Sequence, residues 1–135
     1  MELLISERKG LMKVADAIWV ATALLHREHP EREDFSVAEI VSKAIEADKD
    51  EGYRPGLQIH ASTHCVADKN PSPGRYRMLH QTRRGFRRLF RDGDPYHEYR
   101  EGGKIVPDES DLPSKYQPLL DWYGRDYSRR GRRGR

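Results

Sequence analysis

Apolar side chains recur at helical spacing over the first part of the chain, before Pro30 interrupts the pattern. The spacing predicts a helix over residues 8–28. Its apolar face is broad, so we expect this helix to anchor the core. The positions that carry the pattern are Leu11, Val14, Ala15, Ile18, Thr22 and Leu25, with Trp19 and Ala21 beside them.

The next apolar stripe begins with a clear helix start. Ser36 is followed three residues later by Glu39, the spacing of a capping box, and Phe35 and Ile40 stand where a hydrophobic staple places its two partners. We therefore predict a helix over 37–48. The residues expected to be buried together are Phe35, Ile40, Val41, Ile18 and Leu89.

A third helix is predicted after the charged loop that ends at Pro55, because proline suits a first helical turn. One side carries Leu57, Ala61, His64 and Cys65, and the other carries Gln58, Ile59, Ser62, Thr63 and Val66. The second side holds small polar residues and two aliphatic ones rather than Glu and Lys. That composition suits a contact surface, although a weakly amphipathic core helix would also show it. Residues 70–74, NPSPG, end the segment.

Residues 76–91 mix arginines with large apolar residues around one glycine. Gly85 can adopt a positive φ, so a three-residue loop of Arg83, Arg84 and Gly85 predicts a β-hairpin. That register pairs Thr82 with Phe86, His80 with Arg88 and Met78 with Phe90. A two-residue loop at Arg84 and Gly85 would shift the pairing by one. In either register we expect apolar side chains on the helices and arginines pointing outward.

The last apolar cluster is Tyr116, Leu119, Leu120, Trp122 and Tyr123. It predicts a helix with Pro118 in its first turn and Gly124 as its end. The domain boundaries that follow are 1–111 for the main domain, 112–124 for the C-terminal helix and 125–135 for a disordered Arg/Gly tail. The helix can pair with a second copy as a homodimer, or pack back on the first helix.

Composition adds a charge pattern to these elements. The 135 residues suit one domain, and the net charge of +3 hides strong blocks. Residues 68–91 carry eight basic side chains and one acidic one, and residues 125–135 carry six and one, while the remainder is acidic. Focused positive charge favours a polyanion contact, and the alternative is that arginines only keep an edge hairpin soluble. A single cysteine and no long apolar run predict a soluble, cytoplasmic protein with no membrane segment.

The order helix, helix, turn, helix, hairpin resembles the winged-helix family of helix-turn-helix proteins over about residues 11–94. The resemblance rests on FSVAEIVSKAI, RPGLQIHASTHCVADK and YRMLHQTRRGFRRLF, and it extends to small prokaryotic winged-helix domains found alone or near restriction or defence nucleases. Those pair a helix ending near His-Cys, here residues 64 and 65, with a Leu…Arg-Gly-aromatic-Arg-Leu hairpin. The acidic first half departs from domains that are often basic throughout.

The resemblance implies an α+β fold, with the third helix in the major groove of double-stranded DNA and the wing on the backbone or minor groove. The implied function is a transcriptional regulator or DNA-targeting accessory module. The groove-facing candidates are Gln58, Ile59, Ser62 and Thr63, and the backbone or wing candidates are Arg54, Arg83, Arg84, Arg87 and Arg88. The alternatives are a protein–protein interaction module, or non-specific RNA binding through the basic tail.

Catalysis and metal binding have little support in the sequence. His60 and His64 share a helix face, but no paired CxxC accompanies them, so a buried Cys65 and hydrogen-bonded histidines are the simpler interpretation. No phosphate-binding glycine loop, nucleophile elbow or HExxH motif occurs. We therefore expect neither enzymatic activity, nor a metal, nor a cofactor.

Overall fold

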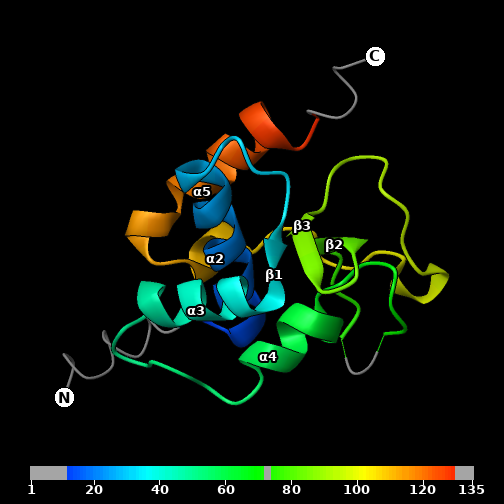
Figure 1. The fold of residues 1–135 in the computed structure, drawn as a ribbon. Coiled ribbons are helices and arrows are strands. Elements are labelled where there is room, and N and C mark those ends of the chain that lie inside the picture. Colours follow the sequence, from blue (N-terminus) through cyan, green and yellow to red (C-terminus); the bar gives the residue numbers. More distant parts are fainter. Residues whose placement is uncertain (1–11, 72–73, 130–135) are drawn as a thin grey trace.

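The computed structural model describes residues 12–71 and 74–129, which form an α+β fold (Figure 1). Four α-helices and a three-stranded antiparallel sheet account for its regular elements within these ranges, and short 3-10 and π-helical turns join them. This confirms the predicted class. In chain order the elements are α2 (Val14–Glu28), β1 (Phe35–Ser36), α3 (Val37–Ala47), α4 (Leu57–Ile59), β2 (Leu79–Arg83), β3 (Phe86–Leu89) and α5 (Pro118–Trp122).

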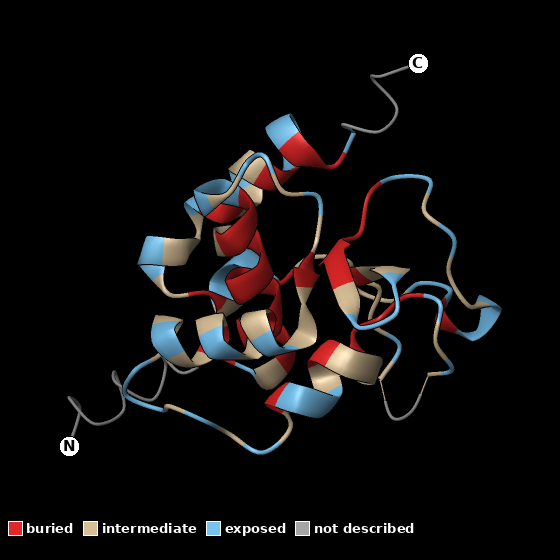
Figure 2. Ribbon diagram, in the orientation of Figure 1, coloured by how far each residue is buried: buried red, intermediate tan, exposed pale blue. Residues whose placement is uncertain are grey.

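Helix α2 is the centre of the core. Eleven of its fifteen residues are buried, as a helix covered on several sides requires (Figure 2). Helix α3, the sheet and the C-terminal segment pack around it. The predicted helix over 8–28 is confirmed from Val14 to Glu28. Met12 and Lys13 precede the helix, and residues 8–11 lie outside the described residues.

Helix α3 begins with the predicted capping box. The Glu39 amide donates to Ser36 Oγ at 3.0 Å, and the Ser36 amide donates to Glu39 Oε1 at 2.8 Å. Such a cap contributes about 1 kcal/mol. Phe35 and Ile40, the staple pair, are both fully buried. Ile18 and Leu89 join them as predicted, whereas Val41 is only partly buried.

The sheet has the strand order β1-β3-β2, so the hairpin of β2 and β3 is extended by a short strand that precedes α3. Arg83 pairs with Phe86, which leaves a two-residue loop with Gly85 at φ 81°. The register then shifts between Gln81 and Arg83, and His80 pairs with Arg88 as the three-residue loop predicted. The bulge at Thr82 therefore reconciles the two registers that the sequence left open.

The third helix is shorter than predicted. Helix α4 continues as a π-helical turn, His60–His64, so the whole third helix spans residues 57–64. The Cys65 carbonyl then accepts from the amides of Met78 and Leu79, which turns the chain into the sheet. Val66 forms a parallel bridge with Leu79 and is fully buried. Its predicted place on the outer helix face was wrong, because the helix ends before it.

The C-terminal segment is longer than predicted and packs on its own chain. Pro118 occupies the first position of α5, as expected, but the helix continues through Gly124 as a π-helical turn, Tyr123–Tyr127. Tyr127 is fully buried, and its hydroxyl donates to the Leu89 carbonyl at 2.9 Å. The start of the tail at residue 125 is thereby corrected: the ordered chain continues at least to Ser128, which is also buried.

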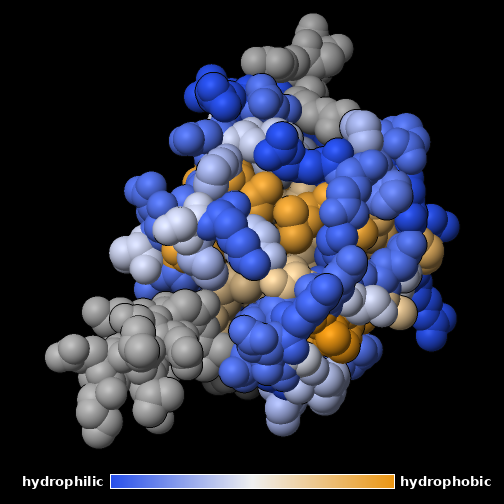
Figure 3. Space-filling model, turned by 90° about the vertical axis from the view of Figure 1, so that its left-hand side faces the viewer, coloured by the Kyte–Doolittle hydropathy of each residue, from blue (hydrophilic) through white to orange (hydrophobic). Residues whose placement is uncertain are grey.

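This packing bears on the predicted homodimer. Leu119, Tyr123 and Tyr127 are buried in the monomer, and the ring of Tyr123 lies 5.9 Å from that of Trp19. Of the five residues that motivated a dimer, Leu119 and Tyr123 are buried and the other three are partly buried, so the chain itself covers part of that apolar surface. The homodimer stays a prediction. The face of α2, α3 and α5 is mostly hydrophilic around a small apolar patch (Figure 3). Within the described ranges, no helix has the length and apolar character needed to cross a membrane.

Candidate functional site

Two arginines from outside the third helix hold its C-terminal end. Arg87 on β3 donates from Nε to the Ala61 carbonyl at 3.3 Å and from Nη2 to the Ser62 carbonyl at 3.1 Å. Arg100 donates to the next two carbonyls, those of Thr63 at 3.2 Å and His64 at 2.9 Å. The last carbonyls of a helix have no partner within it. Here four in succession bond to guanidinium groups, which fixes the third helix beside the hairpin (Figure 1).

Arg100 uses every donor that a guanidinium has. Beyond Thr63 and His64 it donates to the carbonyls of Lys69 at 2.7 Å, Asn70 at 3.2 Å and Tyr76. Five acceptors match the five N–H groups of arginine. Its burial is complete and lowers its pKa from the ordinary value, but the carbonyl cage stabilises the charge. Arg100 thus ties the third helix, the 69–70 loop and the approach to β2 into one unit.

Three of the arginines that the sequence assigned to DNA have hydrogen-bond partners within the fold. Arg87 is buried against the third helix as described. Arg88 is also buried, and forms a bidentate ion pair with Asp94 at 2.9 and 3.0 Å. Arg54 is partly buried and donates to the Met12 carbonyl at 2.7 Å. The expectation that the hairpin arginines point outward was wrong for Arg87 and Arg88, because both faces of β3 are covered where they stand.

The hairpin tip, residues 83–85, retains exposed charge. Arg83 and Arg84 are both exposed. The start of α3 holds the tip in place, since the Val37 amide donates to the Gly85 carbonyl at 3.0 Å. Asp34 accepts hydrogen bonds from the Thr82 hydroxyl and from Arg83 Nε. Burial alone would raise the pKa of Asp34, but these hydrogen bonds outweigh it and hold the pKa below its ordinary value.

The outer face of the third helix carries the four groove-facing candidates. Gln58 and Ile59 are exposed, and Ser62 and Thr63 are partly buried one turn later. Ile59 is 43% exposed, and Tyr53, just before the helix, is 60% exposed. No acidic residue occurs between Glu51 and Asp68. The structure thus presents a helix face that carries no acidic side chain, and a basic tip on the hairpin that Arg87 joins to that helix.

The histidines on this helix face each other. The rings of His60 and His64 are 4.9 Å apart, and His60 Nδ1 bonds to the Gly56 carbonyl at 2.9 Å. Burial, then the nearby His60 and Arg100, lower the pKa of His64. Cys65 is fully buried, as predicted, and burial raises its thiol pKa. In the described part of the chain, no three metal-binding side chains of His, Cys, Asp or Glu come together.

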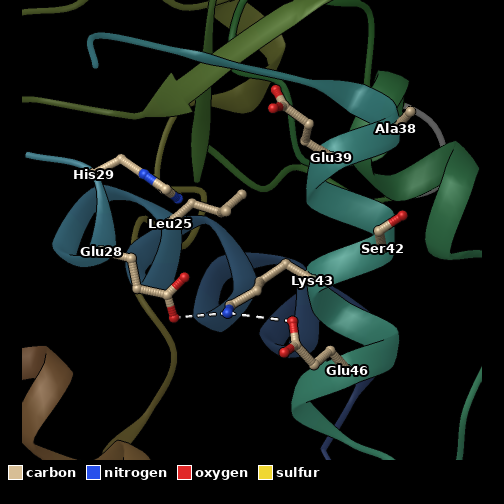
Figure 4. A pocket seen from close by; sticks show the side chains of 8 residues that line it. All are labelled: Leu25, Glu28, His29, Ala38, Glu39, Ser42, Lys43 and Glu46. Carbon is tan, nitrogen blue, oxygen red and sulfur yellow. Dashed lines mark hydrogen bonds and ion pairs between the residues drawn. The ribbon is translucent and has the colours of Figure 1, made fainter. Parts of the chain in front are cut away.

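An open groove of about 400 Å³ lies elsewhere, between α2 and α3 (Figure 4). Lys43 crosses it and pairs with Glu28 at 2.6 Å and Glu46 at 3.3 Å. Its other lining residues include His29 and Glu39, and Glu39 is itself paired with Arg32. The ionic groups at the groove are therefore largely satisfied by one another.

Comparison of the chain with protein-family models, with curated proteins and with solved structures finds no match in any of the three. Any proposal of function therefore depends on the geometry of the chain itself.

Proposed function

We propose that this chain is a winged-helix protein that binds double-stranded DNA, with the outer face of the third helix toward the major groove and the hairpin tip on the phosphate backbone. The observation that carries the proposal is the rigid attachment of the third helix to the hairpin through Arg87 and Arg100. Polar side chains that can contact bases are thereby held in a fixed position relative to cations that can contact phosphates.

The dimensions and chemistry of the third helix support this proposal. Eight residues of helix extend about 12 Å, comparable to the width of the major groove. Gln58 can form a bidentate pair with adenine, Ser62 and Thr63 can bond to several base edges, and Ile59 can contact a thymine methyl group. The strand before α3 also completes a three-stranded sheet around the hairpin, an arrangement compatible with a winged helix.

The hairpin supplies fewer cations than the sequence suggested. With Arg87 and Arg88 turned inward, Arg83 and Arg84 are the arginines that the tip offers to phosphate. Each phosphate contact adds about one unit to the salt dependence of binding. We therefore propose a small backbone contribution from the tip. The terminal arginines 130–135 lie outside the described residues, and RNA binding by the tail stays a prediction.

Binding titrations on duplexes selected from a random library, and on random duplexes, test the proposal. Gln58→Ala and Thr63→Ala should each reduce the preference for selected over random duplexes by about 1–3 kcal/mol, because each removes a side chain that contacts a base. Neither should change the salt slope much. Arg84→Ala should reduce the salt slope instead. Lys115→Ala, which removes an exposed cation before α5, is the matched control and should change neither quantity.

A protein partner is the second candidate function. Two large side chains, Tyr53 and Ile59, are exposed near the start of the third helix, and such residues suit the centre of a protein interface. Duplex binding with no salt dependence, or no binding, would move this candidate to first place.

A further inference from the structure

The guanidinium of Arg83 is held on two sides although its side chain is 64% exposed. Its Nε donates to Asp34 Oδ2 at 3.4 Å, and its central carbon lies 3.7 Å from the centre of the Phe86 ring. The same carboxylate oxygen accepts from the Thr82 hydroxyl, which orients Asp34 in turn. A side chain of high rotamer entropy is thus restrained at the tip of the hairpin.

The restraint leaves the binding end of the guanidinium free. Among the described residues, neither Nη1 nor Nη2 of Arg83 has a hydrogen-bond partner. These two nitrogens form the fork that binds two oxygens of a phosphate. Arg84, the adjacent exposed arginine, forms no hydrogen bond or ion pair within the described ranges. The two neighbours carry the same charge but differ in how far they are ordered before binding.

We propose that Arg83 is a preorganised phosphate-binding arginine, and that Asp34 and Phe86 are positioning residues that hold its fork outward. This inference rests on the proposed DNA binding and names its principal backbone contact. Holding a side chain in its bound conformation avoids the entropy cost of ordering it at an interface. A carboxylate beside a phosphate also repels it. If Asp34 instead acted as a competitor that neutralises Arg83, its removal would tighten DNA binding rather than weaken it.

Equilibrium binding of the intact chain to a random-sequence duplex at low salt separates the two roles. Asp34→Ala removes a negative charge, so charge alone predicts tighter binding. The proposal predicts weaker binding, by about threefold. Phe86→Leu leaves the net charge unchanged and should also weaken binding, by about twofold to threefold. Arg83→Ala should lose more affinity than Arg84→Ala, which removes the same charge one residue away.

A double variant tests whether Asp34 acts through Arg83. In the Arg83→Ala background, Asp34→Ala should no longer weaken binding, because no guanidinium remains to be positioned. The free protein gives a second readout: the Arg83 Nε–H signal should show restricted motion by ¹⁵N relaxation, in contrast to Arg84, and Asp34→Ala should release it. Thermal unfolding of each variant checks that the fold is retained.

The outcomes distinguish this inference from the proposed DNA binding on which it rests. A wild-type chain that does not bind duplex DNA overturns the proposed function, and this inference with it. A wild-type chain that binds, with Asp34→Ala binding more tightly or Phe86→Leu binding equally well, overturns only the preorganised Arg83.

Discussion

Arg100 offers the sharpest test of how the third helix is held. Replacing it with Met keeps much of the side-chain volume but removes five donors from five carbonyls. Of these carbonyls, that of Thr63 also accepts from the Val66 amide, at 3.1 Å. The other four depend on Arg100 for the hydrogen bonds that the structure shows.

The expected cost is large for a single substitution. A buried acceptor left without its partner costs about 1–3 kcal/mol. Relaxation and entering water recover part of that cost, so we expect Arg100→Met to lower the free energy of unfolding by about 4 kcal/mol, near the upper end for point variants. Arg100→Lys keeps the charge but has three donors on a compact head, so its cost should be about 2–3 kcal/mol.

Urea unfolding followed by circular dichroism measures these differences. Hydrogen exchange should place the loss of protection in residues 57–64 and the 69–70 loop before the rest of the fold. Arg84→Met is the matched control, since that arginine is exposed, and should change stability by less than about 0.5 kcal/mol. An Arg100→Met protein within about 1 kcal/mol of wild type would refute the reasoning that the carbonyl cage fixes the third helix.

Two further predictions concern stability. Asp16 is buried, and burial raises its pKa to about 6. The free energy of unfolding should therefore fall by up to about 3 kcal/mol as pH rises from about 4 through 6. In urea titrations, the stability advantage of Asp16→Asn over wild type should grow by that amount between pH 4 and 7, and a constant difference would contradict it. At Gly103 a Cβ would lie 1.6 Å from the Arg75 carbonyl oxygen, so Gly103→Ala should lower the free energy of unfolding by about 1–3 kcal/mol. Gly124→Ala, with nothing within 4 Å of the added Cβ, is its control, and equal thermal stability of these two variants would refute the steric argument.

Local signals predicted the elements well because each depends on residues close in sequence. The capping box at Ser36 and Glu39 marks the start of α3, and Gly85 marks the hairpin turn. The end of the terminal helix was harder to predict. Gly124 suggested a stop, but Tyr127 stands four residues after Tyr123 on the same side of the helix, and its burial against Leu89 carries the helix past the glycine.

The contacts at the candidate site that the sequence did not predict join residues that lie far apart in the chain. Apart from the bond of Arg87 to the Phe86 carbonyl, Arg87 and Arg100 bond to main-chain carbonyls at least 24 residues away, and such bonds leave no periodic pattern to detect. Arg100 also stands among turn-forming residues, where an exposed side chain is the ordinary expectation. Asp34 reaches the hairpin tip only because β1 pairs with β3, and a two-residue strand has too few positions to show alternation.

The central claim is that the outer face of the third helix and the hairpin tip form one DNA-binding surface. Mapping amide chemical shifts of the ¹⁵N-labelled chain during titration with a selected duplex tests it most directly. We predict that the largest changes fall in residues 57–64 and 83–85 and that the groove between α2 and α3 stays unchanged. Saturable binding whose largest changes lie at that groove, with residues 57–64 unaffected, would contradict the claim.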